Sequence, residues 1–102
     1  MANNKANSNI ISNNSDKILL TGAGGLVGSR ISELLRGRDV THFELSDPDD
    51  GFPSIEGNLC DAYAVEQVCR GIDTVIHVAG LHGKTWADAG DNTGFELNIM
   101  GT

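Results

Sequence analysis

The stretch that most constrains the fold of this chain is the octet Thr21-Gly22-Ala23-Gly24-Gly25-Leu26-Val27-Gly28. It follows a short apolar run, 18–20, and opens a stretch in which apolar residues recur at helical spacing as far as Leu35. Glycines let a backbone approach a bound group closely, and the unpaired N–H groups of a helix's first turn attract anions. An apolar run, a glycine-rich turn and a helix in this order therefore predict a site for a nucleotide phosphate.

The spacing of the glycines distinguishes between kinds of phosphate loop. A Walker-type loop ends in Gly-Lys-Ser/Thr, and the octet contains no lysine. The frame G-x-G-x-x-G starting at Gly22 fails, because its last position is Val27. The frame G-x-x-G-x-x-G fits through Gly22, Gly25 and Gly28. The octet is therefore interpreted as a nucleotide-binding turn that is not of the Walker type.

Apolar patterning along the rest of the chain predicts strands that alternate with helices. The expected elements are a strand over Lys17–Thr21, a helix over 25–36, a strand over 40–45, a weak strand around Ile55, a helix capped by Asp61, a strand over 74–79, a polar loop over 81–93 and a helix from about Gly94. Short links between such elements imply right-handed crossovers and a parallel sheet.

We therefore predict an α/β fold, part of a Rossmann-type doubly wound parallel sheet with strand order 3-2-1-4. In this fold the glycine turn lies at the carboxyl edge of the sheet, beside the point where the strand order reverses. Residues 1–15 are rich in Asn and Ser and are predicted to form a disordered tail. The remaining residues, 16–102, have the length of one small domain or of part of a larger one.

Composition narrows the partners and the location. The net charge of -7 argues against nucleic acid and anionic membranes, because phosphate-rich surfaces select basic proteins. No apolar stretch approaches the roughly 20 residues that span a bilayer, and the N-terminus lacks a secretory pattern. The two cysteines, Cys60 and Cys69, do not have metal-ligand spacing. Free, buried thiols in a reducing cytoplasm are the expectation, with no bound metal.

An acidic residue about 20 positions beyond the last loop glycine would hold the adenosine ribose of a dinucleotide. Asp47 lies 19 positions beyond Gly28 and is the first candidate. Glu44 is the weaker candidate, because it is expected inside the second strand. A simple turn before Pro48 is the alternative role for Asp47. No arginine follows Asp47 in this turn to pair with a 2′-phosphate, so NAD is favoured over NADP.

Residues in three further segments are open to more than one interpretation. Asn58, after the third strand, could present its amide to an adenine ring or serve as a turn residue. His77 could be an acid–base group, but its place within a strand that is expected to be buried favours a hydrogen-bonded core histidine. In the loop after the fourth strand, Lys84 and Trp86 could line a substrate pocket, or Trp86 could pack that loop down.

Four motifs together resemble the extended short-chain dehydrogenase/reductases, and more narrowly the NAD-dependent epimerase/dehydratase family. They are the octet 21–28, Gly57-Asn58-Leu59-Cys60-Asp61, His77-Val78-Ala79-Gly80 and Asn98-Ile99-Met100-Gly101-Thr102. The resemblance covers residues 17–102. There are two departures from the family pattern. Asn58 stands where the family usually has aspartate, and the acidic turn after Asp47 is displaced by one residue.

The resemblance implies that most of these positions bind NAD. The backbone amides of Leu26 and Val27 would reach the pyrophosphate, within a turn shaped by the three spaced glycines. The rest of the implied set is Asp47 for the adenosine ribose, Asn58 and Leu59 for the adenine, Ala79, Gly80 and Leu81 along the ribose and nicotinamide, and Asn98 for ordering the catalytic region.

The resemblance also implies chemistry for which this chain lacks the residues. Family members use a tyrosine and a lysine four residues later to exchange the proton of the substrate hydroxyl, while hydride moves to or from the nicotinamide. Here the one tyrosine, Tyr63, is followed by Gln67 at that spacing. The pair is expected beyond Thr102, so the chain is interpreted as a fragment or truncated product that is inactive alone.

The parent is expected to be an epimerase, dehydratase or sugar (sugar-acid) dehydrogenase that acts on a sugar or nucleotide sugar, and to be a homodimer. Two alternatives remain at this point. One is a non-catalytic dinucleotide-sensing protein that keeps the glycine turn, and the other is a scaffold without a ligand.

Overall fold

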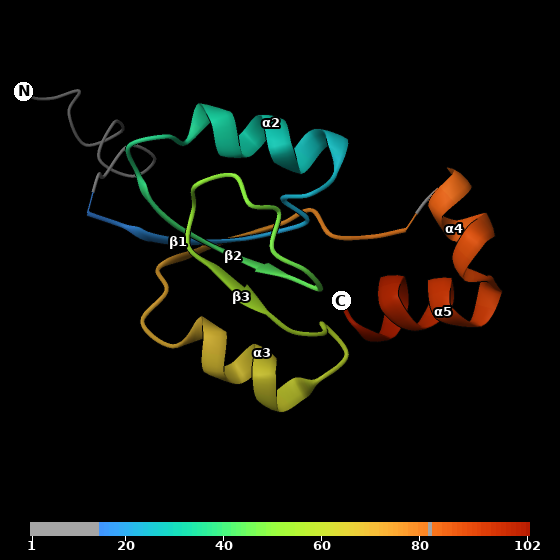
Figure 1. Cartoon of the computed structure of the whole chain (residues 1–102). Coiled ribbons are helices and arrows are strands. Elements are labelled where there is room, and N and C mark those ends of the chain that lie inside the picture. The colour runs from blue at the N-terminus through green and yellow to red at the C-terminus, as the bar shows by residue number, and fades with distance from the viewer. Residues whose placement is uncertain (1–14, 82) are drawn as a thin grey trace, which may run out of the picture.

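A four-stranded parallel sheet forms the centre of the computed structural model, which describes residues 15–81 and 83–102 (Figure 1). Its strands are β1 (Lys17–Thr21), β2 (Asp39–Glu44), β3 (Ser54–Glu56) and β4 (Thr74–His77). Their order is β3-β2-β1-β4, and all three pairings are parallel. The predicted fold class and strand order are confirmed. The predicted tail lies outside the described residues except for Ser15.

Helices lie on opposite faces of this sheet (Figure 1). α2 (Leu26–Leu34) follows the glycine turn and covers one face, whereas α3 (Ala62–Cys69) lies on the other. Asp61 caps α3 as predicted, because its Oδ1 accepts a hydrogen bond of 3.2 Å from the Ala64 amide. Beyond α2 the chain turns at Gly37, whose φ of 90° is favourable for glycine.

The polar loop predicted over 81–93 is wrong, because this stretch contains a helix. The chain forms α4 (Gly83–Ala89), α5 (Asp91–Phe95) and the π-helix η1 (Glu96–Met100), which project beyond one end of the sheet (Figure 1). Trp86 explains why. Its indole Nε1 donates to Asp91 Oδ1 at 2.8 Å, and its ring lies where a Cβ on Gly94 would be. Trp86 therefore packs α4 on α5.

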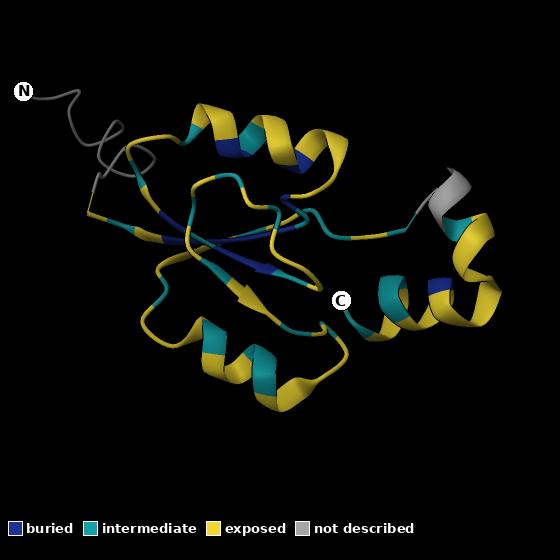
Figure 2. Ribbon diagram, in the orientation of Figure 1, coloured by how far each residue is buried: buried dark blue, intermediate teal, exposed yellow. Residues whose placement is uncertain are grey.

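The buried core lies between β1, β2 and α2 (Figure 2). Its buried apolar members are Ile18, Leu20, Ala23 and Val40, with Ile31 and Leu35 of the α2 segment packed against them. Leu19 and Phe43 are buried as well, but on the strand positions that face the other side of the sheet. The other face is covered thinly, since no residue of α3 is buried and three of the four β4 residues are exposed. Burial of apolar surface stabilises the fold in proportion to its area, so the β1–β2–α2 layer supplies most of the hydrophobic stabilisation.

One fully buried polar side chain belongs to this layer. His42 is 0% exposed on β2, and its Nε2 is 3.0 Å from the buried hydroxyl of Ser32 on α2. Its Nδ1 lies 3.5 Å from Asp50 Oδ2, and the Phe52 ring packs at 4.9 Å between centroids. Buried polar atoms are costly unless paired, so the Ser32 hydroxyl makes Nε2 compatible with the core, whereas Nδ1 has Asp50 nearby but no hydrogen bond.

Replacing Ser32 with alanine is expected to lower the free energy of unfolding by about 1–3 kcal/mol, because His42 Nε2 loses its buried partner. Urea unfolding followed by circular dichroism measures this loss. Ser29→Ala is the matched control on the same helix, since the Ser29 hydroxyl is exposed and donates to the Leu26 carbonyl one turn earlier. We expect the control to change stability by less than about 0.5 kcal/mol. Equal losses in the two variants would contradict the role given to Ser32.

Candidate functional site

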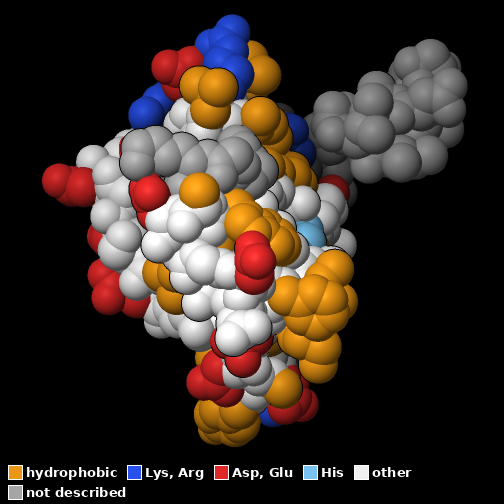
Figure 3. All heavy atoms as spheres, turned by 90° about the vertical axis from the view of Figure 1, so that its right-hand side faces the viewer, with side chains coloured by type: hydrophobic (Ala, Val, Ile, Leu, Met, Phe, Trp, Pro, Cys, Tyr) orange, Lys and Arg blue, Asp and Glu red, His pale blue; other side chains and the backbone are white. Residues whose placement is uncertain are grey.

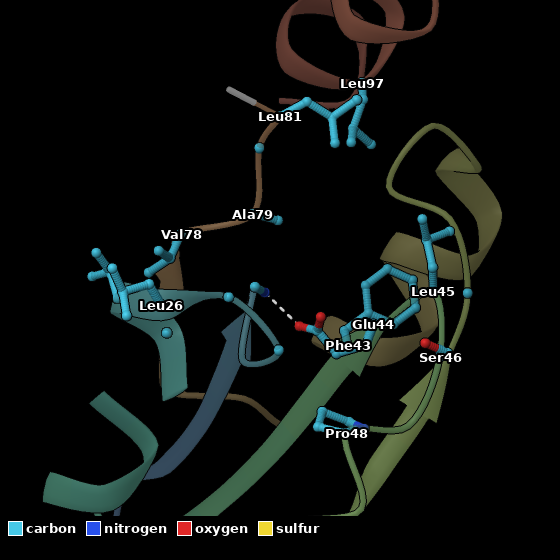
Figure 4. Close-up of a pocket in the computed structure, with 17 residues that line it drawn as sticks. Leu26, Phe43, Glu44, Leu45, Ser46, Pro48, Val78, Ala79, Leu81 and Leu97 are labelled. Carbon is cyan, nitrogen blue, oxygen red and sulfur yellow. Dashed lines mark hydrogen bonds between the residues drawn. The ribbon is translucent and has the colours of Figure 1, made fainter. Parts of the chain in front are cut away.

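A cavity of about 680 Å³ lies at the carboxyl edge of the sheet, where β1, β2 and β4 end (Figure 4). It is lined by most of the glycine turn (Gly22 and Gly24–Gly28), by Phe43–Ser46 and Pro48, by Gly57, by Val78–Leu81 and by Leu97. Segments far apart in the sequence thus meet where parallel α/β folds bind ligands. The predicted location of the glycine turn is confirmed by this arrangement.

Two glycines of the turn are required by close backbone approach. Gly22 has a φ of 86°, and a Cβ there would lie 2.6 Å from the Ala79 amide nitrogen. A Cβ on Gly28 would overlap the Gly22 carbonyl oxygen. The same oxygen accepts a hydrogen bond of 3.1 Å from the Gly25 amide. Gly24 differs, because the nearest atom to a Cβ there is a Glu44 oxygen at 3.9 Å. The turn is therefore held at its ends and open in its middle.

The N-terminus of α2 faces this cavity. Leu26 and Val27 line it and remain 89% and 60% exposed. The N-cap residue is Gly25, which offers no side-chain hydrogen bond, and the first turn contains no acidic residue. The first amides of a helix have no partner within the helix and carry a partial positive charge. This end of α2 is therefore suited to a bound anion.

Glu44, the last residue of β2, points at the glycine turn (Figure 4). Its Oε2 accepts hydrogen bonds from the Gly22 amide and, at 2.8 Å, from the Ala23 amide. Glu44 also lines the cavity, with Oε1 turned toward Gly24. A half-buried carboxylate therefore fixes the turn with one oxygen and leaves the other for a ligand.

Asp47, the first candidate from the sequence, lies elsewhere. It is exposed and does not line the cavity. Its Oδ1 accepts a hydrogen bond of 2.8 Å from the Asp49 amide, within a turn in which Asp49 has a φ of 57°. The structure thus gives Asp47 the turn role that was its alternative. β2 ends at Glu44 rather than at 45, and this places Glu44 at the turn.

The predicted adenine residues, Asn58 and Leu59, also lie outside the cavity lining. Asn58 Oδ1 accepts a hydrogen bond of 2.8 Å from the Cys60 amide, which is the turn role left open for it. Gly57 lines the cavity instead, packed so closely that a Cβ would lie 2.5 Å from the Phe43 ring. A glycine directly after a short strand was the signal in the sequence for this close approach.

Ala79, Gly80 and Leu81 line the cavity on the β4 side. Asn98 does not line it but holds this segment, because its amide makes two hydrogen bonds of 2.7 Å with the backbone of Leu81. A Cβ on Gly80 would lie 3.4 Å from Asn98 Oδ1, a tight contact. Asn98 therefore positions the wall without reaching into the cavity.

His77 is not the core histidine that the sequence predicted. It ends β4 and is exposed, because no strand or helix covers this end of β4 in the part of the chain that the structure describes. Its ring is nevertheless hydrogen-bonded, with Nδ1 2.6 Å from the hydroxyl of Thr21 at the end of β1. His77 therefore does not line the cavity but directly precedes Val78 and Ala79, which do.

Other classes of site are not apparent in the described residues. Within 15–81 and 83–102 there is no group of three or more His, Cys, Asp or Glu that could hold a metal ion. No helix there is long and apolar enough to cross a membrane. Cys60 and Cys69 are free, but the prediction that they are buried is wrong, because both are exposed. Figure 3 shows carboxylates spread over the side that carries α4 and α5, with Lys and Arg mostly toward one end.

Comparison with known proteins gives one family and several related folds. Residues 18–102 match the model of the NAD dependent epimerase/dehydratase family. A short-chain dehydrogenase/reductase superfamily protein from Agrobacterium tumefaciens, solved with bound NAD, is 32% identical with a TM-score of 0.73. The match covers 83% of this chain and 26% of that chain.

Two further structures are similar. MoeE5 in complex with UDP-glucose and NAD is 28% identical with a TM-score of 0.68, over 83% of this chain and 29% of that one. L-threonine dehydrogenase from Clostridium difficile shares the fold at 23% identity and a TM-score of 0.75, over 85% and 30%. The chain thus spans between 26% and 30% of the length of these three proteins.

Proposed function

This chain belongs to the NAD-dependent epimerase/dehydratase family, and from that premise we propose that it supplies the NAD-binding site of an enzyme acting by hydride transfer on a sugar or nucleotide-sugar hydroxyl. The observation that carries the proposal is the uncapped N-terminus of α2 behind a turn too tight for side chains at Gly22 and Gly28. That arrangement matches the pyrophosphate site of dinucleotide-binding folds.

In the proposed complex the amides of Leu26 and Val27 bind the pyrophosphate. Glu44, rather than Asp47, accepts hydrogen bonds from the adenosine ribose, because its carboxylate lies in the cavity beside the turn. A carboxylate at this place also repels a 2′-phosphate, so NAD is favoured over NADP. Apolar residues on the two sides of Glu44 would flank the adenine, namely Phe43, Leu45 and Pro48.

The nicotinamide end is proposed to lie toward Ala79, Gly80 and Leu81. Leu97 of η1 lies beside Leu81 there (Figure 4) and would exclude water from that side. NAD supplies the hydride chemistry when it is bound. This chain's residues bind and orient the cofactor, and Asn98 keeps the Leu81 backbone in place.

Proton exchange with the substrate hydroxyl is proposed to depend on residues that this chain does not contain. Tyr63 lies on α3, is 71% exposed and does not line the cavity. The chain alone is therefore expected to bind NAD without oxidising a substrate. The sugar or nucleotide-sugar class is supported by the family match and by a relative that was solved with UDP-glucose.

Titration calorimetry tests the proposal. We expect NAD to bind the chain saturably at one site, in the micromolar to millimolar range, and NADP to bind more weakly because of Glu44. Absence of saturation up to millimolar NAD, with the chain folded by circular dichroism, would favour the scaffold without a ligand.

A second candidate function, a dinucleotide sensor, is favoured by one observation, the lack of any tyrosine in the cavity lining. The two functions differ in hydride transfer. A longer protein that carries this chain would be incubated with NAD and a panel of sugars, sugar acids and UDP-sugars, and NADH would be followed by absorbance. NADH formation supports the enzyme. Tight NAD binding without NADH formation on any substrate supports the sensor.

A further inference from the structure

A buried hydroxyl group holds the start of the cavity wall after β4. Thr21 is 2% exposed, and its Oγ1 accepts hydrogen bonds from the Val78 amide at 3.1 Å and the Ala79 amide at 3.2 Å. These two residues line the cavity and pass directly over Gly22, where a Cβ would lie 2.6 Å from the Ala79 nitrogen. Thr21 therefore fixes the wall against the glycine turn.

The hydrogen on Thr21 has one remaining destination. A threonine hydroxyl has two acceptor lone pairs and one hydrogen to donate. Both lone pairs of Thr21 Oγ1 face backbone amides, so its hydrogen is directed to His77 Nδ1, at 2.6 Å. Nδ1 must then be an acceptor, and the neutral ring carries its hydrogen on Nε2.

The other side of the ring agrees with this assignment. His77 Nε2 lies 3.5 Å from Thr102 Oγ1, whose own hydrogen is donated to the Asn98 carbonyl at 2.8 Å. Thr102 Oγ1 is therefore free to accept from the Nε2 hydrogen. The donors run in one direction from Thr21 through His77 and Thr102 to Asn98, the residue that holds Leu81.

From this chain of donors we infer that His77 is a positioning residue for the cofactor site, and that it holds the wall only as a neutral imidazole with its hydrogen on Nε2. The inference rests on the proposed NAD site. A protonated imidazole carries hydrogen on both nitrogens. Nδ1 would then face the Thr21 hydroxyl as a second donor. To accept that hydrogen, Thr21 Oγ1 would have to release one of its two amides. The Val78 amide also donates to the Thr21 carbonyl at 3.1 Å and would keep that partner, whereas the Ala79 amide bonds to the hydroxyl at 3.2 Å and would lose that bond.

The groups around the His77 imidazole are uncharged. His77 is hydrogen-bonded to two hydroxyls, Thr21 from β1 and Thr102 after η1, and in the described residues no carboxylate forms an ion pair with it. The other titratable groups of the site and core are Glu44, which binds the glycine turn, and His42 with Asp50, which lie where β2 packs against α2. A protonated His77 ring is therefore expected to support NAD binding less well than a neutral one.

The test is the pH dependence of NAD affinity, measured by calorimetry between pH 8 and 5.5 on the whole chain. For the wild type we expect affinity to fall by about 2–10-fold on acidification, the equivalent of one net hydrogen bond. His77→Asn supplies an acceptor oxygen near the place of Nδ1 and does not titrate. We expect it to restore the affinity seen at pH 8 and to lose the histidine-dependent part of the pH profile. His77→Phe, which has no acceptor, should bind more weakly at every pH.

A second readout is independent of NAD. The amide resonances of Val78 and Ala79 should shift between pH 8 and 5.5 in the wild type and shift less in His77→Asn. Glu44, His42 and Asp50 are unchanged in the variant, so any titration they cause persists. Equal pH profiles of NAD affinity in wild type and His77→Asn would overturn the inference, as would amides that do not respond. If NAD fails to bind at pH 8 while these amides titrate, the proposed function fails and the hydrogen-bond chain stands.

Discussion

Alanine at Gly28 is expected to abolish NAD binding. Its Cβ would overlap the Gly22 carbonyl oxygen, and the nearest atoms are backbone, which cannot rotate away as a side chain can. The turn must open, so the α2 amides no longer converge on one point. Overpacking of this kind costs about 1–3 kcal/mol of stability. Calorimetry with NAD and urea unfolding measure the two effects on the same sample.

The matched control is Gly24→Ala, in the same turn. A Cβ at Gly24 would lie 3.9 Å from Glu44 Oε1, an ordinary contact, and Gly24 does not have a positive φ. We expect this variant to keep NAD binding within about threefold and stability within about 0.5 kcal/mol. If Gly28→Ala bound NAD as Gly24→Ala does, the phosphate site would not depend on the closed turn.

The second large effect concerns the acidic residue at the end of β2. Glu44→Gln is expected to weaken NAD binding about tenfold or more, because hydrogen bonds to a charged group contribute about 1.5–3 kcal/mol and each 1.4 kcal/mol is tenfold. The same change is expected to narrow the preference for NAD over NADP, since it removes the negative charge that opposes a 2′-phosphate. Calorimetry with both cofactors measures both results.

Asp47→Asn is the control that separates the two acidic candidates. Asp47 is exposed, outside the cavity lining, and bonded to the Asp49 amide. We expect its replacement to change NAD affinity by less than about twofold, within the effect of an exposed charge. A large loss of NAD affinity in Asp47→Asn and none in Glu44→Gln would instead support Asp47 as the residue that holds the adenosine ribose.

The glycine turn, the fold class and the strand order could be predicted because their signals are local. Spacing of Gly22, Gly25 and Gly28 reports on backbone geometry, and the apolar runs report on buried parallel strands. The order 3-2-1-4 then follows from the handedness of crossovers. An error of one residue in the end of a strand or helix would not change any of these predictions.

The site residues depend on such ends, and there the sequence is less informative. Counting 19 positions from Gly28 leads to Asp47, but β2 already ends at Glu44. Element boundaries are the least reliable part of any reading from sequence, and a shift of three residues moves a carboxylate from the cavity to a surface turn. Glu44 was the weaker candidate from the sequence, and what favours it over Asp47 is a tertiary feature, its contact with the Gly22 and Ala23 amides.

Tertiary contacts explain the other differences. α4 forms in a stretch of weak helical pattern because the Trp86 indole packs on Gly94, a contact between elements that no periodicity reveals. His77 was expected in a buried strand, and its exposure follows from the edge position of β4. Its bond to Thr21 joins residues 56 positions apart.

The central claim is that main-chain amides at the start of α2 bind the pyrophosphate of NAD. Amide chemical shifts followed by NMR during titration with NAD test it most directly. The account predicts that the largest shifts fall on Leu26, Val27 and Gly28, with smaller ones at Gly22 and Ala23, and that pyrophosphate alone reproduces the first group. Shifts confined to α3 or to the β2 turn around Asp47, with the α2 amides unchanged by saturating NAD, would contradict it.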